Sequence, residues 1–295
     1  MNQRRYQLRV RFRSFPVVIL VLVLIAGCTP ITKRPLGPAG DYSDAVDFFG
    51  KGNLKRTIEF TDNLVTASPP NDYTDRARVL RIIVFSGQVN AFKELTDAYS
   101  KGLETTKDSR AKADFGGQRA DNLQLGVQAA LHLAETLHSL TQSGALPKDL
   151  VLEAPYPSAE GPTVVAQLSR VKEGGAISAD DQQAAAVAAQ RKGIDDALAE
   201  VVGGGRAEAR SALKAGPVKL DDYKFALFLA NQALTGATLL NRKHMHDIEK
   251  FKILCGEADA AAKAALATLQ DNPDKDKGKE IKKLQDEIKA ALKAG

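Results

Sequence analysis

Residues 75–102, DRARVLRIIVFSGQVNAFKELTDAYSKG, are the stretch that decides the fold. Apolar and small residues recur in it every three or four positions, which is the period of an amphipathic helix. The repeating positions are Ala77, Leu80, Val84, Gly87, Ala91, Leu95 and Ala98. Gly87 and Ala91 lie one turn apart on this stripe and are small. We therefore expect a neighbouring helix, the one over 54–67, to cross there at close range.

Helical patterns extend on both sides of this stretch. Residues 111–142 carry two apolar stripes, which predicts a helix in the centre of the molecule. Residues 220–240 are apolar almost all round and predict the core helix of the C-terminal part. A transmembrane span is the rival interpretation, but Asp221, Asp222 and Lys224 argue against it.

The composition favours helices over a sheet, because Trp is absent and only 6% of the residues are aromatic. The sequence therefore predicts an all-α protein. We expect antiparallel helical hairpins in the N-terminal part, followed by an irregular helical C-terminal part.

Prolines and glycines divide the chain into segments. The expected segments, in chain order, are a signal peptide at 1–27, a flexible tether at 28–40, an N-terminal helical region at 41–143, a Pro/Gly-rich connecting loop at 144–175 that contains a short helix over 163–172, a C-terminal helical region at 176–271, and a linker with a terminal amphipathic helix at 272–295. The tether holds three prolines and two glycines, which exclude a helix there.

One repeat-like pattern follows the tether. Ala45 and Phe48 on a first helix, Gly52 at a turn and Pro69 after a second helix together resemble a tetratricopeptide repeat. Thr57 and Leu64 stand where that family prefers alanine, and Thr61 stands where it prefers a large apolar residue. A second unit, carried by Ala91 and Ala98 about 34 residues later, is degenerate. The resemblance implies a scaffold of stacked helical hairpins, and a plain helical hairpin is the alternative.

The N-terminus indicates export. Five arginines and no acid precede an uninterrupted run of nine apolar residues, 17–25. The run is too short to span a bilayer, which needs about 20 residues, but it is typical of a secretory signal. It ends in Ile25, Ala26, Gly27 and Cys28, and this order resembles the lipobox of bacterial lipoproteins.

The lipobox resemblance implies a lipid anchor. In that family a signal peptidase recognises the positions of Ile25, Ala26 and Gly27 and cuts before Cys28, which carries the acyl chains, palmitate among them. An ordinary secretory signal or an uncleaved anchor with an incidental cysteine is the alternative. Thr29 follows the cysteine, where an aspartate would favour inner-membrane retention. We therefore expect the chain on the periplasmic face of the outer membrane, held through the lipid at Cys28.

Charge excludes one class of partner. The whole chain has 41 Lys and Arg against 36 Asp and Glu, but the signal segment removes five arginines and no acid. The remaining chain is formally balanced, whereas a nucleic-acid-binding domain normally carries a basic surplus. Nucleic acid is therefore not an expected partner. Cys255 has no partner for a disulfide in the mature chain, and its helical context predicts a buried, inert thiol.

Motifs for chemistry are weak. His132, Glu135 and His138 form the best metal candidate, because Glu135 and His138 share a helix face, but a second such pair is missing. The three glycines at 203–205 resemble a phosphate loop without its Lys-Ser/Thr, so we interpret them as a hinge. The acid pairs at 180–181, 195–196 and 221–222 are expected near helix starts or on exposed turns. The sequence predicts no catalytic residue, no metal and no cofactor.

Two functions fit these observations. The first is a non-enzymatic, lipid-anchored scaffold that binds a protein or peptide of the cell envelope on a concave face, with Tyr99 among the residues that line it. The second is a solute-handling accessory, because lipobox, tether and irregular repeat body together are similar to the T-component lipoproteins of TRAP transporters. An open groove favours the first function, and a closed apolar pocket favours the second. An enzyme comes third.

Overall fold

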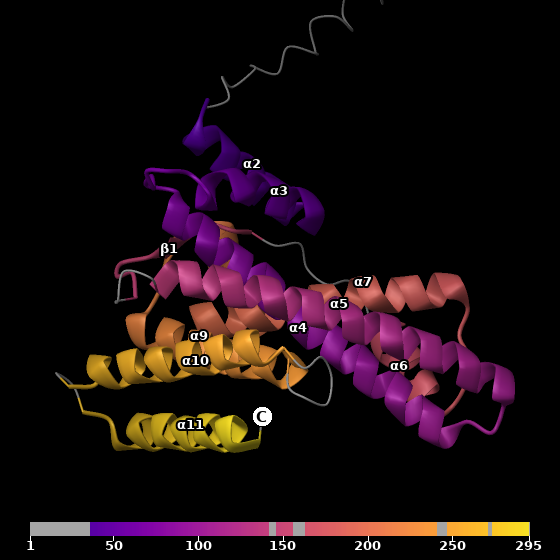
Figure 1. The fold of residues 1–295 in the computed structure, drawn as a ribbon. Helices are drawn as coiled ribbons and strands as arrows, with labels where there is room; N and C mark the ends of the chain where they lie inside the picture. The colour runs from indigo at the N-terminus through magenta and orange to yellow at the C-terminus, as the bar shows by residue number, and fades with distance from the viewer. Residues whose placement is uncertain (1–35, 142–145, 156–162, 241–246, 271–272, 295) are drawn as a thin grey trace, which may run out of the picture. The chain divides into compact units, whose positions relative to one another are not determined.

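The computed structural model describes residues 36–141, 146–155, 163–240, 247–270 and 273–294. The signal segment, Cys28 and the first part of the tether lie outside these ranges. The described residues form ten helices and two short strands (Figure 1). Their bounds are α2 Pro38–Gly50, α3 Leu54–Val65, α4 Thr74–Thr105, α5 Ser109–Thr141, β1 Val151–Leu152, α6 Thr163–Lys172, α7 Ala179–Val202, α8 Arg206–Ala215, β2 Val218–Lys219, α9 Asp222–Leu240, α10 Ile248–Thr268 and α11 Lys275–Ala294. The predicted all-α fold is confirmed.

The first hairpin consists of α2 and α3. The helix α2 starts at Pro38, so the prediction that 28–40 contains no helix is wrong for its last three residues. Proline fits there because the first N–H groups of a helix have no intrahelical partner. Gly52, at φ +71°, makes the turn between the two helices. The Asn53 side chain then caps α3 by accepting a hydrogen bond from the backbone N–H of Arg56.

Two threonines replace apolar residues on the buried face of α3. Thr57 and Thr61 are both fully buried. Their hydroxyl groups donate to the backbone carbonyls of Asn53 and Thr57, at 3.0 and 2.9 Å. Because each hydroxyl finds a partner within its own helix, the face can be buried without an orphaned polar group.

The long helix α4 is central, and it contacts α3, α5, α6, α7 and α9. All seven residues of its predicted stripe are buried. The helix that crosses at Gly87 is α7, however, and not the one over 54–67, so that prediction is wrong. A Cβ atom on Gly87 would lie 2.7 Å from the backbone nitrogen of Ile194. A Cβ atom on Gly193 would clash with the backbone carbonyl of Gly87, so two glycines let the two backbones touch.

The helix α5 packs along α4 as an antiparallel partner. Its C-terminal half is buried on two sides, through Ala129 and Leu133 on one stripe and Ala130 and Ala134 on the other. This confirms the predicted central helix for that half. Leu125 belongs to the same stripes but is 44% exposed.

A two-stranded antiparallel sheet joins the connecting loop to the segment before α9. Val151 pairs with Lys219 and Leu152 with Val218. The apolar residues of the loop are covered, and Leu152 is 1% exposed. The loop before α9 supplies the second strand, which no sequence pattern indicated because each strand has two residues.

The C-terminal part is a layer of α9, α10 and α11 (Figure 1). As predicted, α9 is a core helix, buried on most of its surface. Within the described residues no helix is long and apolar enough to cross a membrane. The helix α11 buries Ile281, Leu284 and Ile288 and leaves Leu292 46% exposed, so it caps the body. On α10, Cys255 is fully buried as predicted, and burial raises the pKa of its thiol to about 11.

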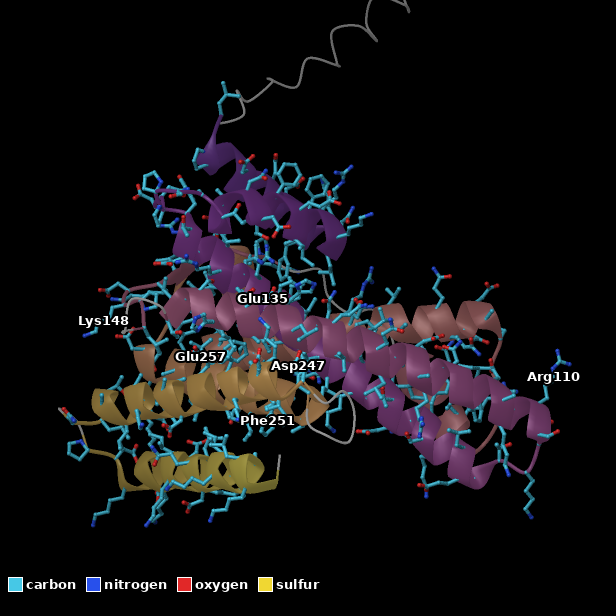
Figure 2. All side chains as sticks on the ribbon, viewed as in Figure 1. Arg110, Glu135, Lys148, Asp247, Phe251 and Glu257 are labelled. Atoms are coloured by element: carbon cyan, nitrogen blue, oxygen red, sulfur yellow. The ribbon has the colours of Figure 1, made fainter. Side chains whose placement is uncertain are left out.

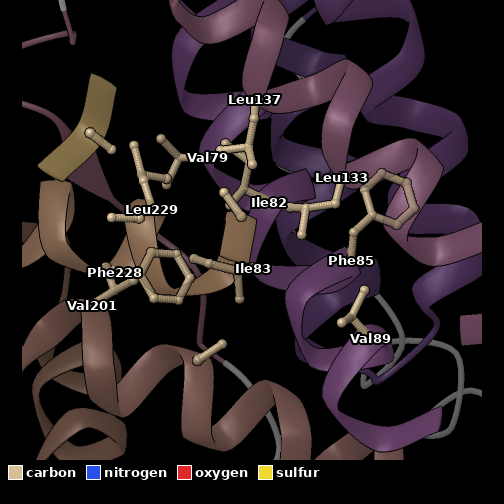
Figure 3. Packing of buried hydrophobic residues seen from close by; sticks show 14 of the residues in the cluster. Val79, Ile82, Ile83, Phe85, Val89, Leu133, Leu137, Val201, Phe228 and Leu229 are labelled. Carbon is tan, nitrogen blue, oxygen red and sulfur yellow. The ribbon is translucent and has the colours of Figure 1, made fainter. Parts of the chain in front are cut away.

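The described residues from Gly37 onward form one compact unit. Its main core draws side chains from all the described helices except α6. Figure 3 shows its centre, where Ile82, Ile83 and Phe85 of α4 meet Leu133 of α5 and Phe228 of α9. A second, smaller cluster lies between the C-terminal half of α4, the N-terminal part of α5 and the helices α6 and α7.

Candidate functional site

A groove lies over α4, between α3 on one side and α5 on the other. Its volume is about 720 Å³. The lining residues are Ile58, Asp62, Val65 and Thr66 at α3, Arg81, Phe85, Gln88 and Phe92 on α4, and Leu125, Gln128, Ala129, His132, Glu135, Thr136 and Ser139 on α5. The groove is open to solvent, because the side chains of Asp62, His132 and Glu135 on its rims are 53%, 54% and 57% exposed.

Arg81 is the buried charge of this groove, with 10% of its side chain exposed. Its Nη1 group donates to the carboxylate of Asp62 on α3. Its guanidinium lies over the ring of Phe85, at 5.3 Å from the ring centroid. Burial lowers the pKa of Arg81, and the nearby carboxylate of Glu135 acts in the opposite direction. The Nε atom of Arg81 is buried and has no hydrogen-bond partner.

Residues of α5 form the other rim of the groove. The imidazole of His132 stacks on the ring of Phe85, with centroids 5.2 Å apart. The carboxylate of Glu135 lies 3.6 Å from Nδ1 of His132 and 3.5 Å from Nζ of Lys250 on α10. Figure 2 labels Glu135 on α5. Charged groups of both signs therefore line a groove whose floor on α4 combines Phe85 and Phe92 with Arg81 and Gln88.

The structure separates the residues of the predicted metal candidate. His132 and Glu135 lie on the groove rim, whereas His138 contacts the carboxylate of Glu257 on α10, at 3.0 Å. Glu257 also accepts a hydrogen bond from Thr141 at 2.6 Å. Among the described residues, no three His, Cys, Asp or Glu side chains are placed to hold one metal ion. A second histidine pair in the sequence, His244 and His246, has no acid three residues before either member and lies outside the described residues.

The prediction that Tyr99 lines a binding face is wrong. Tyr99 is 1% exposed and packs against the ring of Phe115, at 5.7 Å between centroids. Burial raises the pKa of its hydroxyl to about 12. Tyr99 belongs to the smaller core cluster, where it joins Leu95 and Ala98 of the predicted stripe against residues of α6 and α7.

Of the predicted acid pairs, 180–181 lies where it was expected and 195–196 has a different role. Asp180 and Asp181 follow the capping Ser178 at the start of α7, as expected. Asp195 is instead buried in the interior of that helix and forms an ion pair with Arg210 of α8. This ion pair joins α7 to α8 across the three glycines at 203–205.

The groove itself was not predicted as a site. Arg81 interrupts an otherwise apolar run at 79–85, and Leu125 lies on an apolar stripe but remains exposed. The first of these signals is visible in the sequence. The second is not, because it depends on how far α3 reaches over α4. Ile25, Ala26, Gly27 and Cys28 lie outside the described residues.

Fold and groove define a class of protein: an all-α body of packed helical hairpins with an open groove of mixed polarity. Comparison with protein-family models, curated protein sequences and solved structures finds no match.

Proposed function

We propose that this chain is a lipid-anchored helical scaffold on the periplasmic face of the outer membrane. It holds an extended peptide segment of an envelope protein in the groove between α3 and α5. The proposal includes no catalysis, no cofactor and no nucleic acid. The lipid at Cys28 is the membrane contact, and the helical hairpins provide a rigid frame.

The observation that carries the proposal is the open, mixed groove. Leu125 offers exposed apolar surface that no core role explains, and the largely buried rings of Phe85 and Phe92 line the groove beside it. Gln88 and Gln128 line the same groove and carry both donors and acceptors, which suit a peptide backbone. A closed apolar cavity would have favoured a small solute instead.

The dimensions of the groove also fit a peptide. Arg81 and Phe92, which both line it, are separated by roughly 16 Å along the axis of α4. An extended chain advances about 3.3 Å per residue, so about five residues would lie along this distance. A short extended segment is therefore the occupant that the groove accommodates best.

The solute-handling accessory remains the second candidate. The groove volume of about 720 Å³ is within the range of small-ligand sites, roughly 300–1,000 Å³. Such sites usually enclose most of their ligand, whereas the rims here are exposed, so we place this function after peptide binding.

A crosslinking pulldown of the full-length lipidated protein from its native envelope tests the proposal. The variant is Leu125→Glu, which places a charge in the groove. Leu266→Glu is the matched control, because Leu266 on α10 is also 44% exposed and lies outside the groove. Exposed substitutions of this kind cost little stability.

We expect the wild type and Leu266→Glu to capture the same partner and Leu125→Glu to lose it. The crosslinked segment, once identified and synthesised, should bind the wild type directly. Equal capture by all three proteins would contradict the groove as the binding site.

A further inference from the structure

Arg81 is unusual among the groove residues because it is both charged and buried. Its side chain is nine-tenths buried, and its Nε group has no hydrogen-bond partner. A buried donor of a charged group that remains unpaired is costly to the free protein. The guanidinium also lies over the ring of Phe85.

Asp62 satisfies this guanidinium only in part. It engages Nη1 and leaves Nε unpaired, so the pair lacks the second, parallel hydrogen bond of a bidentate arginine–carboxylate contact. Asp62 is also half exposed, and therefore free to turn toward solvent. Glu135 is the other nearby carboxylate, but Lys250 and His132 already lie beside it.

We propose that Arg81 receives an Asp or Glu side chain of the bound peptide, and that Asp62 is an intramolecular competitor that this side chain displaces. This inference rests on the proposed function and adds the chemistry of the partner. A peptide carboxylate can engage two donors of the guanidinium, while the apolar residues of the peptide lie toward Phe92 and Leu125.

A side chain is favoured over a chain terminus because the groove continues past Arg81. The contact of Phe85 with His132 fixes the alignment of α4 with α5. Since the two helices are antiparallel, Ser139 lies beyond the level of Arg81 and still lines the groove. The peptide backbone can therefore run on past the arginine.

The absence of Trp from the chain provides a clean signal. The probe is the peptide acetyl-Trp-Ala-Ala-Glu-Ala-Ala-Trp-amide, whose tryptophan fluorescence is the only such emission in the sample. Its symmetry offers an apolar residue on either side of the carboxylate, whichever way the peptide lies. The matched peptide carries Gln in place of Glu. A third peptide carries Gln and a free terminal carboxylate.

Each peptide is titrated into the full-length protein in detergent. We expect the Glu peptide to bind about tenfold more tightly than the Gln peptide, as for a hydrogen-bonded charge pair. Asp62→Asn should tighten the Glu peptide severalfold and leave the Gln peptide unchanged. Arg81→Gln should remove the difference between the two peptides.

Glu59→Gln is the control for Asp62→Asn. It removes an equal charge from the same helix, but from the exposed pair with Arg56 outside the groove. Circular dichroism checks that each variant folds. If Arg81→Gln does not fold, the comparison of Asp62→Asn with Glu59→Gln still tests whether Asp62 competes with the peptide carboxylate.

Three results would overturn the inference: equal affinities for the Glu and Gln peptides, no tightening by Asp62→Asn beyond that of Glu59→Gln, or no binding of any probe. Tighter binding of the peptide with the free terminal carboxylate than of the Glu peptide would also contradict the inference, because Arg81 would then recognise a chain terminus. Equal affinities together with a crosslink that Leu125→Glu abolishes would leave the proposed function intact and reject this inference alone.

Discussion

At the residue scale, the crossing of α4 and α7 depends on two glycines. The backbone of Gly87 meets that of Gly193 and Ile194, with no room for a side chain. We expect Gly87→Ala to destabilise the protein, because overpacking typically costs about 1–3 kcal/mol and the gain in helix propensity is about 1 kcal/mol. Urea unfolding of the chain without residues 1–28 measures the free-energy change.

Gly116→Ala on α5 is the control for this substitution. A Cβ atom at Gly116 would meet nothing within 4 Å, so the variant should gain helix propensity and unfold at a higher urea concentration. If Gly87→Ala and Gly116→Ala shift the midpoint in the same direction, the close crossing of α4 and α7 is wrong.

The thiol of Cys255 supplies a second residue-scale prediction. Burial raises its pKa from 9.0 to about 11, so the reactive thiolate is scarce in the folded protein at pH 8. The chain has two cysteines, and without residues 1–28 only Cys255 remains. We expect iodoacetamide to label it only after unfolding in urea, as measured by mass spectrometry. Equal labelling rates in the folded and unfolded protein would show that α10 is not packed as described.

At the element scale, α11 stabilises the body through one face. Ile281 is 1% exposed, whereas Leu292 on the same helix is 46% exposed. We expect Ile281→Ala to cost about 2–5 kcal/mol and Leu292→Ala less than about 0.5 kcal/mol. Thermal unfolding of the two variants measures the difference. Equal, small losses would mean that α11 does not cover α9 and α10 in solution.

The elements that could be predicted from the sequence are those with a strong local pattern. The stripe of α4, the acid pair 180–181 at the start of α7 and the short helix at 163–172 all depend on residues within a few positions of one another. The neighbour of Gly87, the burial of Tyr99 and the pair of Asp195 with Arg210 depend on which helices meet. Periodicity shows that a face is buried, but it does not say against which element.

The groove could be predicted from the sequence only in part. Arg81 within an apolar run is a local signal that a buried charge needs a partner. The identity of that partner, Asp62 on α3, follows only from the way α3 lies over α4. The two-residue strands could not be predicted either, because their pairing is set by long-range packing and leaves almost no sequence pattern.

At the scale of the whole molecule, the proposed function requires a lipid anchor on the body. Cys28→Ala should yield an unprocessed precursor that still carries residues 1–27, because cleavage of a lipoprotein signal requires the modified cysteine. Metabolic labelling with palmitate should mark the wild type and not the variant. Label on Cys28→Ala, or its normal processing, would rule out the lipobox interpretation.

We propose that the anchored body meets its partner through the groove between α3 and α5. The most direct test is a photoreactive amino acid placed at Leu125, and separately at Leu266, in the full-length protein in living cells. We predict that irradiation attaches one envelope protein to the chain at position 125 and not at position 266. An adduct at neither position, or the same adducts at both, would contradict partner binding in this groove.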